Sequence, residues 1–318
     1  MNKQVFHVAI TRFSIRMHPE GGFRGRSKEW LFDEERLAQK LTLFEHVCFS
    51  SISKGSKQPD LLLVLIDREL PKTIRQRLEH VIDPFSWAQT YELDPGALAN
   101  MRDIGTLLGN FGIKSDFILT TNLDDDDALG ADYIQNLKSH VKQHQIQHPN
   151  QPFHWFGSID MQEWDILPSK DAPRGYLKPY SGGVLFTLST GFSVLTKNDP
   201  NGPNVFSLSH SRCLDFLTIK DRRKNYDRKG RFKFRIRLAF QALKMRSWRT
   251  TLSIASGQDF ATRLDSGRIG EFQGLIINHG DNLQRGRIKN GINKRLPAND
   301  KLLASTFNVN AKEVVTNI

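Results

Sequence analysis

The stretch Asp116-Phe117-Ile118-Leu119-Thr120-Thr121-Asn122-Leu123-Asp124-Asp125-Asp126-Asp127-Ala128-Leu129 runs from apolar, strand-forming residues into four consecutive aspartates. The apolar part predicts a buried strand over residues 115–123, and a helical pattern follows the acids. Alternate side chains of a strand face the same way, so Asp124 and Asp126 can clamp one divalent ion. Their hard oxygen ligands suit Mg²⁺ or Mn²⁺. The alternative is a solvated acidic helix N-terminus, where the helix dipole favours Asp; the long apolar run favours the metal site.

The chain before the acids alternates between strand and helix patterns. Predicted strands cover residues 4–10, 60–67 and 88–93, and helical spacing separates them. This alternation predicts an α/β fold with parallel strands and helices on both faces of the sheet.

Candidate ligand-binding residues lie at the carboxyl ends of the first two predicted strands. They are Thr11, Arg12 and Phe13 at the first strand and Asp67 at the second. Ligands of open α/β sheets bind at the carboxyl ends of the strands. Arg12 can therefore contact a nucleotide base or phosphate, and Phe13 can stack on a base. The alternatives are a surface Arg beside a core Phe, and a turn residue at Asp67.

Three motifs carry a resemblance to a known family. Thr121–Leu129 resembles the T-x-L-D-x-D-D-A-L signature of the "putative rhamnosyltransferases", which are related to GT-A glycosyltransferases. Thr11-Arg12-Phe13 and Ile277-Asn278-His279-Gly280-Asp281-Asn282 match in the same chain order, so the resemblance spans most of residues 5–285. It implies a GT-A-like, Rossmann-like α/β fold, with a mixed central sheet flanked by helices. It also implies metal-dependent transfer of a sugar, with rhamnose as one candidate, from a nucleotide-sugar donor.

The resemblance also implies roles for single residues. Asp124 and Asp126 would hold the metal, Asp127 would support its shell, and Asp125 would meet the ribose or the sugar. Asp67 would bind the nucleoside. Arg102 would meet the donor diphosphate. His279 would complete the metal shell or touch the donor diphosphate.

The second half of the chain predicts the acceptor side. Residues 153–196 read as strands crowded with Trp, Tyr and Phe, whose rings suit the C–H faces of sugars; plain β-core is the alternative. His210 is the candidate general base, because its ordinary pKa lies near neutrality. Asp160 and Glu163 are rivals, and His210 also has a purely structural reading. The expected product is the inverted anomer, with retention left open.

Charge is concentrated in one segment. The net charge is +11, and residues 220–249 hold thirteen Lys or Arg and two Asp, which also gives +11. Such a segment attracts anions, namely a phosphorylated sugar carrier, a lipid-linked or glycan acceptor, an anionic membrane face or, as the least favoured partner, nucleic acid. A solvated basic face is the alternative.

Composition indicates a soluble globular protein, with 38% hydrophobic and 25% charged residues. Two cysteines, no run of ~20 apolar residues and no apolar leader predict a cytoplasmic protein, in contact with a membrane at most peripherally.

We expect a donor-binding half over residues 1–127, an acceptor-binding half over 128–285 and a peripheral basic tail over 286–318. Two other functions stay open, a metal-dependent phosphoester hydrolase and a non-enzymatic binder of polyanions.

Overall fold

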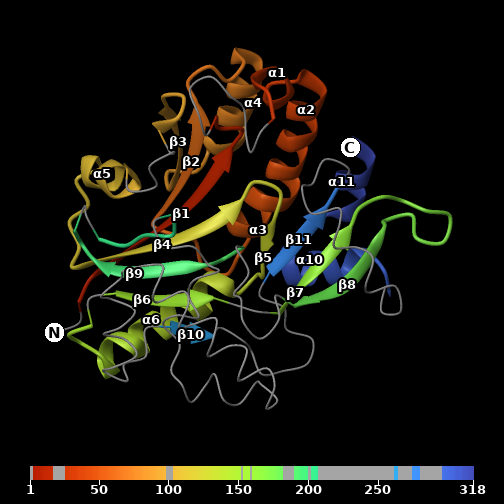
Figure 1. Cartoon of the computed structure of the whole chain (residues 1–318). Coiled ribbons are helices and arrows are strands. Elements are labelled where there is room, and N and C mark those ends of the chain that lie inside the picture. The colour runs from red at the N-terminus through yellow and green to blue at the C-terminus, as the bar shows by residue number, and fades with distance from the viewer. Residues whose placement is uncertain are drawn as a thin grey trace, which may run out of the picture.

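The computed structural model in Figure 1 shows two β-sheets with helices packed around them. It describes residues 3–16, 26–97, 103–151, 153–157, 160–181, 190–199, 202–206, 261–263, 274–279 and 296–318. The basic segment 220–249, His210 and Arg102 all lie outside these residues.

The first sheet has seven strands in the order β10-β6-β9-β4-β1-β2-β3. Strands β1 to β4 are parallel to one another, whereas β9 is antiparallel to β4 and β6. The bounds are β1 (Val5–Phe13), β2 (Leu61–Asp67), β3 (Ala88–Leu93), β4 (Phe117–Asp124), β6 (Phe153–Gly157), β9 (Ser193–Lys197) and β10 (Ala261–Arg263). The predicted mixed α/β fold is confirmed.

The two central parallel strands explain the apolar runs in the sequence. Every residue of β2 is buried, and only Asp124 of β4 is partly exposed. Both strands are covered on both faces, so neither shows the polar–apolar alternation of a half-exposed strand.

Helices cover both faces of this sheet. One face packs against α2 (Glu34–Leu43), α4 (Lys72–Ile82) and α6 (Tyr133–Gln147), and the other against α5 (Asp103–Asn110). Neighbouring strand residues contribute to opposite faces: Val8 and Ile10 pack on the α5 side, and Ala9 packs on the α2 side. Two short helices and a π-helical segment complete this part; they are α1 (Lys28–Leu31), α3 (Ser50–Ser53) and η1 (Phe44–Phe49).

The second sheet has five strands in the order β12-β8-β7-β11-β5. Their bounds are β5 (Ala128–Leu129), β7 (Asp160–Asp165), β8 (Tyr176–Ser181), β11 (Gly274–Asn278) and β12 (Leu296–Pro297). The short strand β5 directly follows the four aspartates and pairs with β11. The predicted helix therefore begins only at Tyr133, because the intervening residues extend the sheet.

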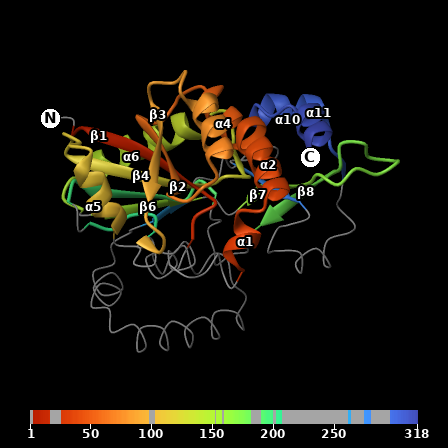
Figure 2. The ribbon, with the colours of Figure 1, turned by 90° about the horizontal axis from the view of Figure 1, so that it is seen from above.

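The expectation of a peripheral tail is wrong for residues 296–318. Helices α10 (Asp300–Phe307) and α11 (Ala311–Asn317) bury Leu303, Phe307 and Val314 against the second sheet. Figures 1 and 2 both place the pair beside that sheet, on the opposite side of the molecule from α5. The buried residues recur at helical spacing, Leu303 with Phe307 and Ala311 with Val314, which the overall polar composition concealed.

The expectation that the aromatic rings of residues 153–196 form a sugar-binding surface also needs correction. Trp155, Phe156 and Trp164 are almost completely buried in the cores of the two sheets, so they are packing residues and not a sugar-binding surface.

No helix among the described residues is long and apolar enough to cross a bilayer.

We predict that Phe307→Ala lowers the free energy of unfolding by about 3–5 kcal/mol, the usual cost of removing a buried Phe side chain. The control Leu302→Ala, five residues earlier on the same helix and 40% exposed, should cost less than about 1 kcal/mol. Urea unfolding of both variants provides the measurement. Equal effects would mean that α10 does not pack as described.

Candidate functional site

The four aspartates lie at the carboxyl end of β4, in a turn closed by a hydrogen bond from the Asp127 N–H to the Asp124 carbonyl (3.2 Å). Their side chains divide into two pairs. Asp124 and Asp126 are partly exposed, with 34% and 22% of their side chains accessible. Asp125 and Asp127 are buried. The turn therefore presents two carboxylates outward and directs two inward.

Asp127 ties the turn to the rest of the fold. One carboxylate oxygen accepts a hydrogen bond from the Thr190 hydroxyl, and the other accepts the backbone N–H of Ile277 at 3.2 Å. Burial, together with the charges of Asp126 and Asp124, raises the pKa of Asp127 well above its usual value. The expected support of a metal shell by Asp127 is thus indirect at most in this structure, because its oxygens face residue 190 and β11.

Asp125 pairs with Lys40 of α2, with 2.6 Å between Nζ and Oδ2. Burial raises the pKa of Asp125, and the Lys40 ammonium opposes that shift. The predicted contact of Asp125 with a ribose or sugar does not fit this arrangement, because its side chain faces α2 and is only 6% exposed.

The two outward carboxylates each have a basic neighbour from another strand. Asp124 Oδ1 lies 3.2 Å from an Arg12 guanidinium nitrogen, and Arg12 and Asp124 are register partners on β1 and β4. Asp126 Oδ2 lies 3.0 Å from Nε2 of His279, which directly follows β11. Burial works against ionisation of Asp126, but the hydrogen bond and charge of His279 outweigh it and lower the pKa. The structure thus brings together four of the predicted site residues.

The Arg12 guanidinium also lies over the ring of Phe206, 5.1 Å from its centroid. Together with the ion pair, this cation–π contact fixes the charge of Arg12 at the edge of the acidic turn.

Three other predicted binding residues are placed in the interior. Phe13 is fully buried and packs edge-to-face on Phe44 with 6.0 Å between ring centroids. It is a core residue in this structure and is not available to stack on a base. Thr11 is also fully buried, with its hydroxyl 4.0 Å from the Cys48 sulfur.

Asp67 is the third. Its carboxylate accepts hydrogen bonds from the Arg16 guanidinium (2.8 and 2.9 Å) and from the Arg16 backbone N–H (3.1 Å). Arg16 is itself buried and also contacts Glu69 at 2.7 Å. A carboxylate with these partners is occupied as a structural ion pair, which does not fit the predicted contact with a nucleoside.

Three of the predicted site residues lie partly or wholly outside the part of the chain that the structure describes. Neither Arg102 nor His210 is described. Asp160 begins β7, but only its backbone is described. The roles of these residues stay predictions.

Lys40 and Thr190 are the site residues that sequence reasoning missed. Lys40 lies on the polar side of a helical pattern, and Thr190 lies in a loop, so neither position carries a signal in a single sequence. Gly191, which follows Thr190, adopts a positive φ of 73° and accepts a hydrogen bond from the Tyr133 hydroxyl. A Cβ at this position would lie 2.8 Å from the Tyr133 ring, which excludes a larger residue.

The donor set can be tested against a divalent ion. No group of three or more His, Cys, Asp or Glu side chains in metal-binding arrangement occurs within the described part of the chain. Two outward carboxylates, Asp124 and Asp126, are available instead. Mg²⁺ is commonly held by only one or two carboxylates, with water and substrate phosphates completing its octahedral shell. The turn therefore fits an ion that binds together with a phosphorylated ligand, and not one held by protein alone.

Comparison with known proteins supports a transferase. Residues 6–154, slightly less than half of the chain, match the family model described as "Putative rhamnosyl transferase". The matched region contains all of β1 except Val5, all of β4 and the whole acidic turn. The match confirms the resemblance seen in the motifs and indicates a glycosyltransferase. No curated protein matches the chain.

Several solved structures are distantly similar. TarS 1-349 of S. aureus is 13% identical over 61% of this chain and 47% of its own, with a TM-score of 0.33. TarS in complex with UDP-GlcNAc is 11% identical over 87% of this chain and 60% of its own, with a TM-score of 0.38. CMP:2-keto-3-deoxy-manno-octonic acid synthetase complexed with CTP is 10% identical over 82% and 89%, with a TM-score of 0.30.

The chain thus spans about half to three fifths of these two TarS chains. These TM-scores are all below 0.5, so the likenesses carry no argument about function.

We predict that Asp67→Ala lowers the free energy of unfolding by about 3–5 kcal/mol, because it leaves the buried Arg16 without its main partner. Asp94→Ala is the matched control: it removes an ion pair with Arg68 whose side chains are both more than half exposed, at a cost of about 0–1 kcal/mol. Chemical denaturation of the two variants distinguishes the cases. A small effect of Asp67→Ala would restore this carboxylate as a candidate for binding a ligand.

Proposed function

We propose that this protein is a divalent-metal-dependent glycosyltransferase that moves a sugar from a nucleotide-sugar donor to a hydroxyl group of a glycan or lipid-linked acceptor. The observation that carries the proposal is the outward pair Asp124 and Asp126. This pair lies at the carboxyl end of the central parallel strand, within the region that matches the family model. The family description makes rhamnose the first sugar to test.

The position of the pair suits a nucleotide. In open α/β sheets ligands bind beyond the carboxyl ends of the strands, and β1 and β4 both end here. Arg12 supplies a fixed positive charge at the same edge, held by Asp124 and Phe206. A guanidinium in this place is suited to bind a diphosphate oxygen.

Asp124 and Asp126 would hold Mg²⁺ or Mn²⁺, and the ion when bound would neutralise charge on the leaving diphosphate. The buried acids have a different task. Asp127 and Asp125 fix the turn through Thr190, the Ile277 N–H and Lys40, so the outward carboxylates need no rearrangement before a ligand binds. Preorganised charge of this kind is the usual source of large catalytic effects.

His279 contacts Asp126, as Arg12 contacts Asp124. Its hydrogen bond keeps the Asp126 carboxylate oriented and ionised. His279 is therefore proposed to position Asp126, and to contact the diphosphate once the donor binds.

The acceptor hydroxyl needs a base, for which His210 and Asp160 stay the candidates. Direct attack assisted by one base would invert the anomeric carbon. The basic segment 220–249 is proposed to attract a phosphorylated or membrane-bound acceptor through its charge.

We predict that Asp126→Asn lowers turnover by at least about a hundredfold and abolishes the metal dependence of nucleotide binding, because the amide carries no charge. Sugar transfer is assayed with a panel of nucleotide sugars in Mn²⁺, and binding of the corresponding nucleoside diphosphates is measured with and without Mn²⁺. A melting temperature close to that of the wild type shows that the fold is intact.

Asp132→Asn is the matched control. Asp132 is an exposed aspartate six residues further along, and its side chain makes no capping hydrogen bond to α6. Full activity of this variant is expected. Wild-type transfer by Asp126→Asn would refute the proposed role of the acidic turn.

A further inference from the structure

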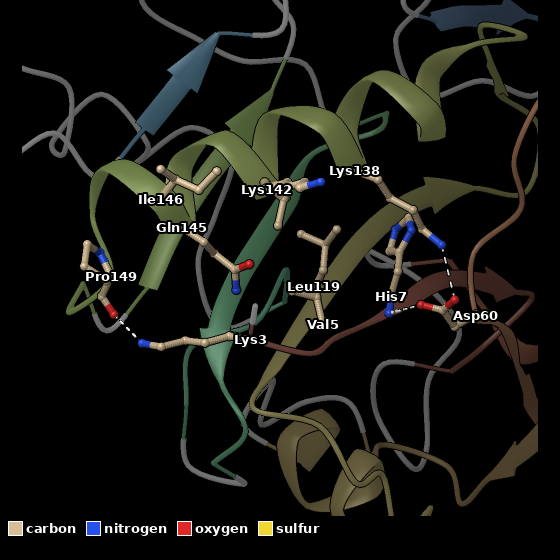
Figure 3. Close-up of a pocket in the computed structure, with 11 residues that line it drawn as sticks. Lys3, Val5, His7, Asp60, Leu119, Lys138, Lys142, Gln145, Ile146 and Pro149 are labelled. Atoms are coloured by element: carbon tan, nitrogen blue, oxygen red, sulfur yellow. Dashed lines mark hydrogen bonds and ion pairs between the residues drawn. The ribbon is translucent and has the colours of Figure 1, made fainter. Parts of the chain in front are cut away.

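A cavity lies away from the acidic turn, on another part of the first sheet. It has a volume of about 560 Å³ and opens between α6 and the beginnings of β1 and β4 (Figure 3). This volume is within the range of small-molecule sites. Leu119 lines it, five residues before Asp124 on β4. At about 3.3 Å per residue the two places are roughly 17 Å apart along the strand.

One end of the cavity contains a buried acceptor. His7 is 1% exposed, and its Nε2 lies 2.8 Å from the Thr121 hydroxyl. Ser193 donates its hydroxyl hydrogen to the Gly191 carbonyl (2.8 Å), so the Thr121 hydroxyl must donate to Ser193 (2.7 Å). Thr121 then accepts from His7, which places the imidazole hydrogen on Nε2 and leaves Nδ1 as an acceptor.

That acceptor has no hydrogen-bond partner in the part of the chain that the structure describes. Burial and the charge of Lys138 lower the pKa of His7 to about 3, so the ring stays neutral and Nδ1 keeps its lone pair at ordinary pH. A buried acceptor without a partner costs free energy, which a ligand hydroxyl would recover.

The other end of the cavity offers donors. The Gln145 side-chain nitrogen is buried and has no hydrogen-bond partner among the described residues. Figure 3 shows it on the same side as Lys3, which reaches the Pro149 carbonyl at 2.5 Å, and away from His7.

The lining also has excess positive charge. Lys138 is paired with Asp60 at 3.2 Å, whereas the exposed Lys142 has no ion pair or hydrogen bond within the described residues. With Lys3, the cavity thus has three ammonium groups and one carboxylate.

The middle of the cavity is aliphatic. Figure 3 shows Val5 and Leu119 between Gln145 and His7; Val141 of α6 also lines the cavity, and Ile146 lies toward the Pro149 end. Lys138 and Ile146 lie eight residues apart on α6, which corresponds to about 12 Å at 1.5 Å per residue.

We propose that this cavity is a second ligand site, which binds an elongated organic anion with an aliphatic body. A hydroxyl at one end of the ligand donates to His7 Nδ1. A carboxylate or phosphate at the other end accepts from Gln145 and lies near Lys3, while Lys142, whose ammonium points toward Lys138, adds positive charge between the two ends. The site does not depend on the acidic turn or on metal.

The test uses the full chain and 8-hydroxyoctanoate as the probe, measured by titration calorimetry. Octanoate lacks the hydroxyl, and 1,8-octanediol lacks the anion. Each should bind about tenfold more weakly than the probe, as expected for one lost hydrogen bond. The ¹⁵N signals of the His7 ring should show the Nε2–H tautomer, and Nδ1 should shift with the probe but not with octanoate.

Two variants locate the binding. Gln145→Leu and Lys142→Gln should each weaken 8-hydroxyoctanoate by about threefold to tenfold and leave 1,8-octanediol unchanged. Lys312→Gln, the same loss of charge on α11, should change neither. The proposal is overturned if none of the three compounds binds saturably, or if the two cavity variants bind the probe as the wild type does.

Discussion

The buried carboxylate of Asp127 holds the end of the central strand in place. It accepts hydrogen bonds from Thr190 on one oxygen and from the Ile277 N–H on the other, so it joins β4 to the segment before β9 and to β11 of the second sheet. Its neighbour Asp125 adds an ion pair to α2 through Lys40. With these two acids fixed inside, the turn leaves the side chains of Asp124 and Asp126 partly exposed. The separation of the acidic turn into two buried and two outward carboxylates follows from this single constraint.

The same constraint explains how four adjacent carboxylates are tolerated. Each has its own partner: Arg12, Lys40, His279, and the neutral donors around Asp127. Burial, and after it the charges of Asp126 and Asp124, raises the pKa of Asp127.

The central sheet and the acidic turn could be predicted from the sequence because both have local signals. An apolar run such as that of β2 predicts a strand buried on both faces, and residues that end neighbouring parallel strands meet at one edge. Arg12 and Asp124 are 112 residues apart, yet they pair for this reason. His279, which follows β11, was found through the family motif.

Other features depend on contacts between distant residues that carry no local signal. Asp67 looked like a ligand residue, but Arg16 from the loop after β1 folds back onto it. Phe13 is the last residue of β1, but its side chain is fully buried in the core. The apolar residues of α10 and α11 are too sparse to dominate their composition, although they close the core of the second sheet.

The central claim is that Asp124 and Asp126 hold a divalent ion together with a nucleoside diphosphate. The most direct test is an anomalous difference map from crystals grown with Mn²⁺ and the nucleoside diphosphate that binds best. The account predicts one Mn²⁺ peak in contact with the carboxylates of Asp124 and Asp126 and with the diphosphate. A nucleotide bound elsewhere, or a peak that touches neither carboxylate, would contradict it.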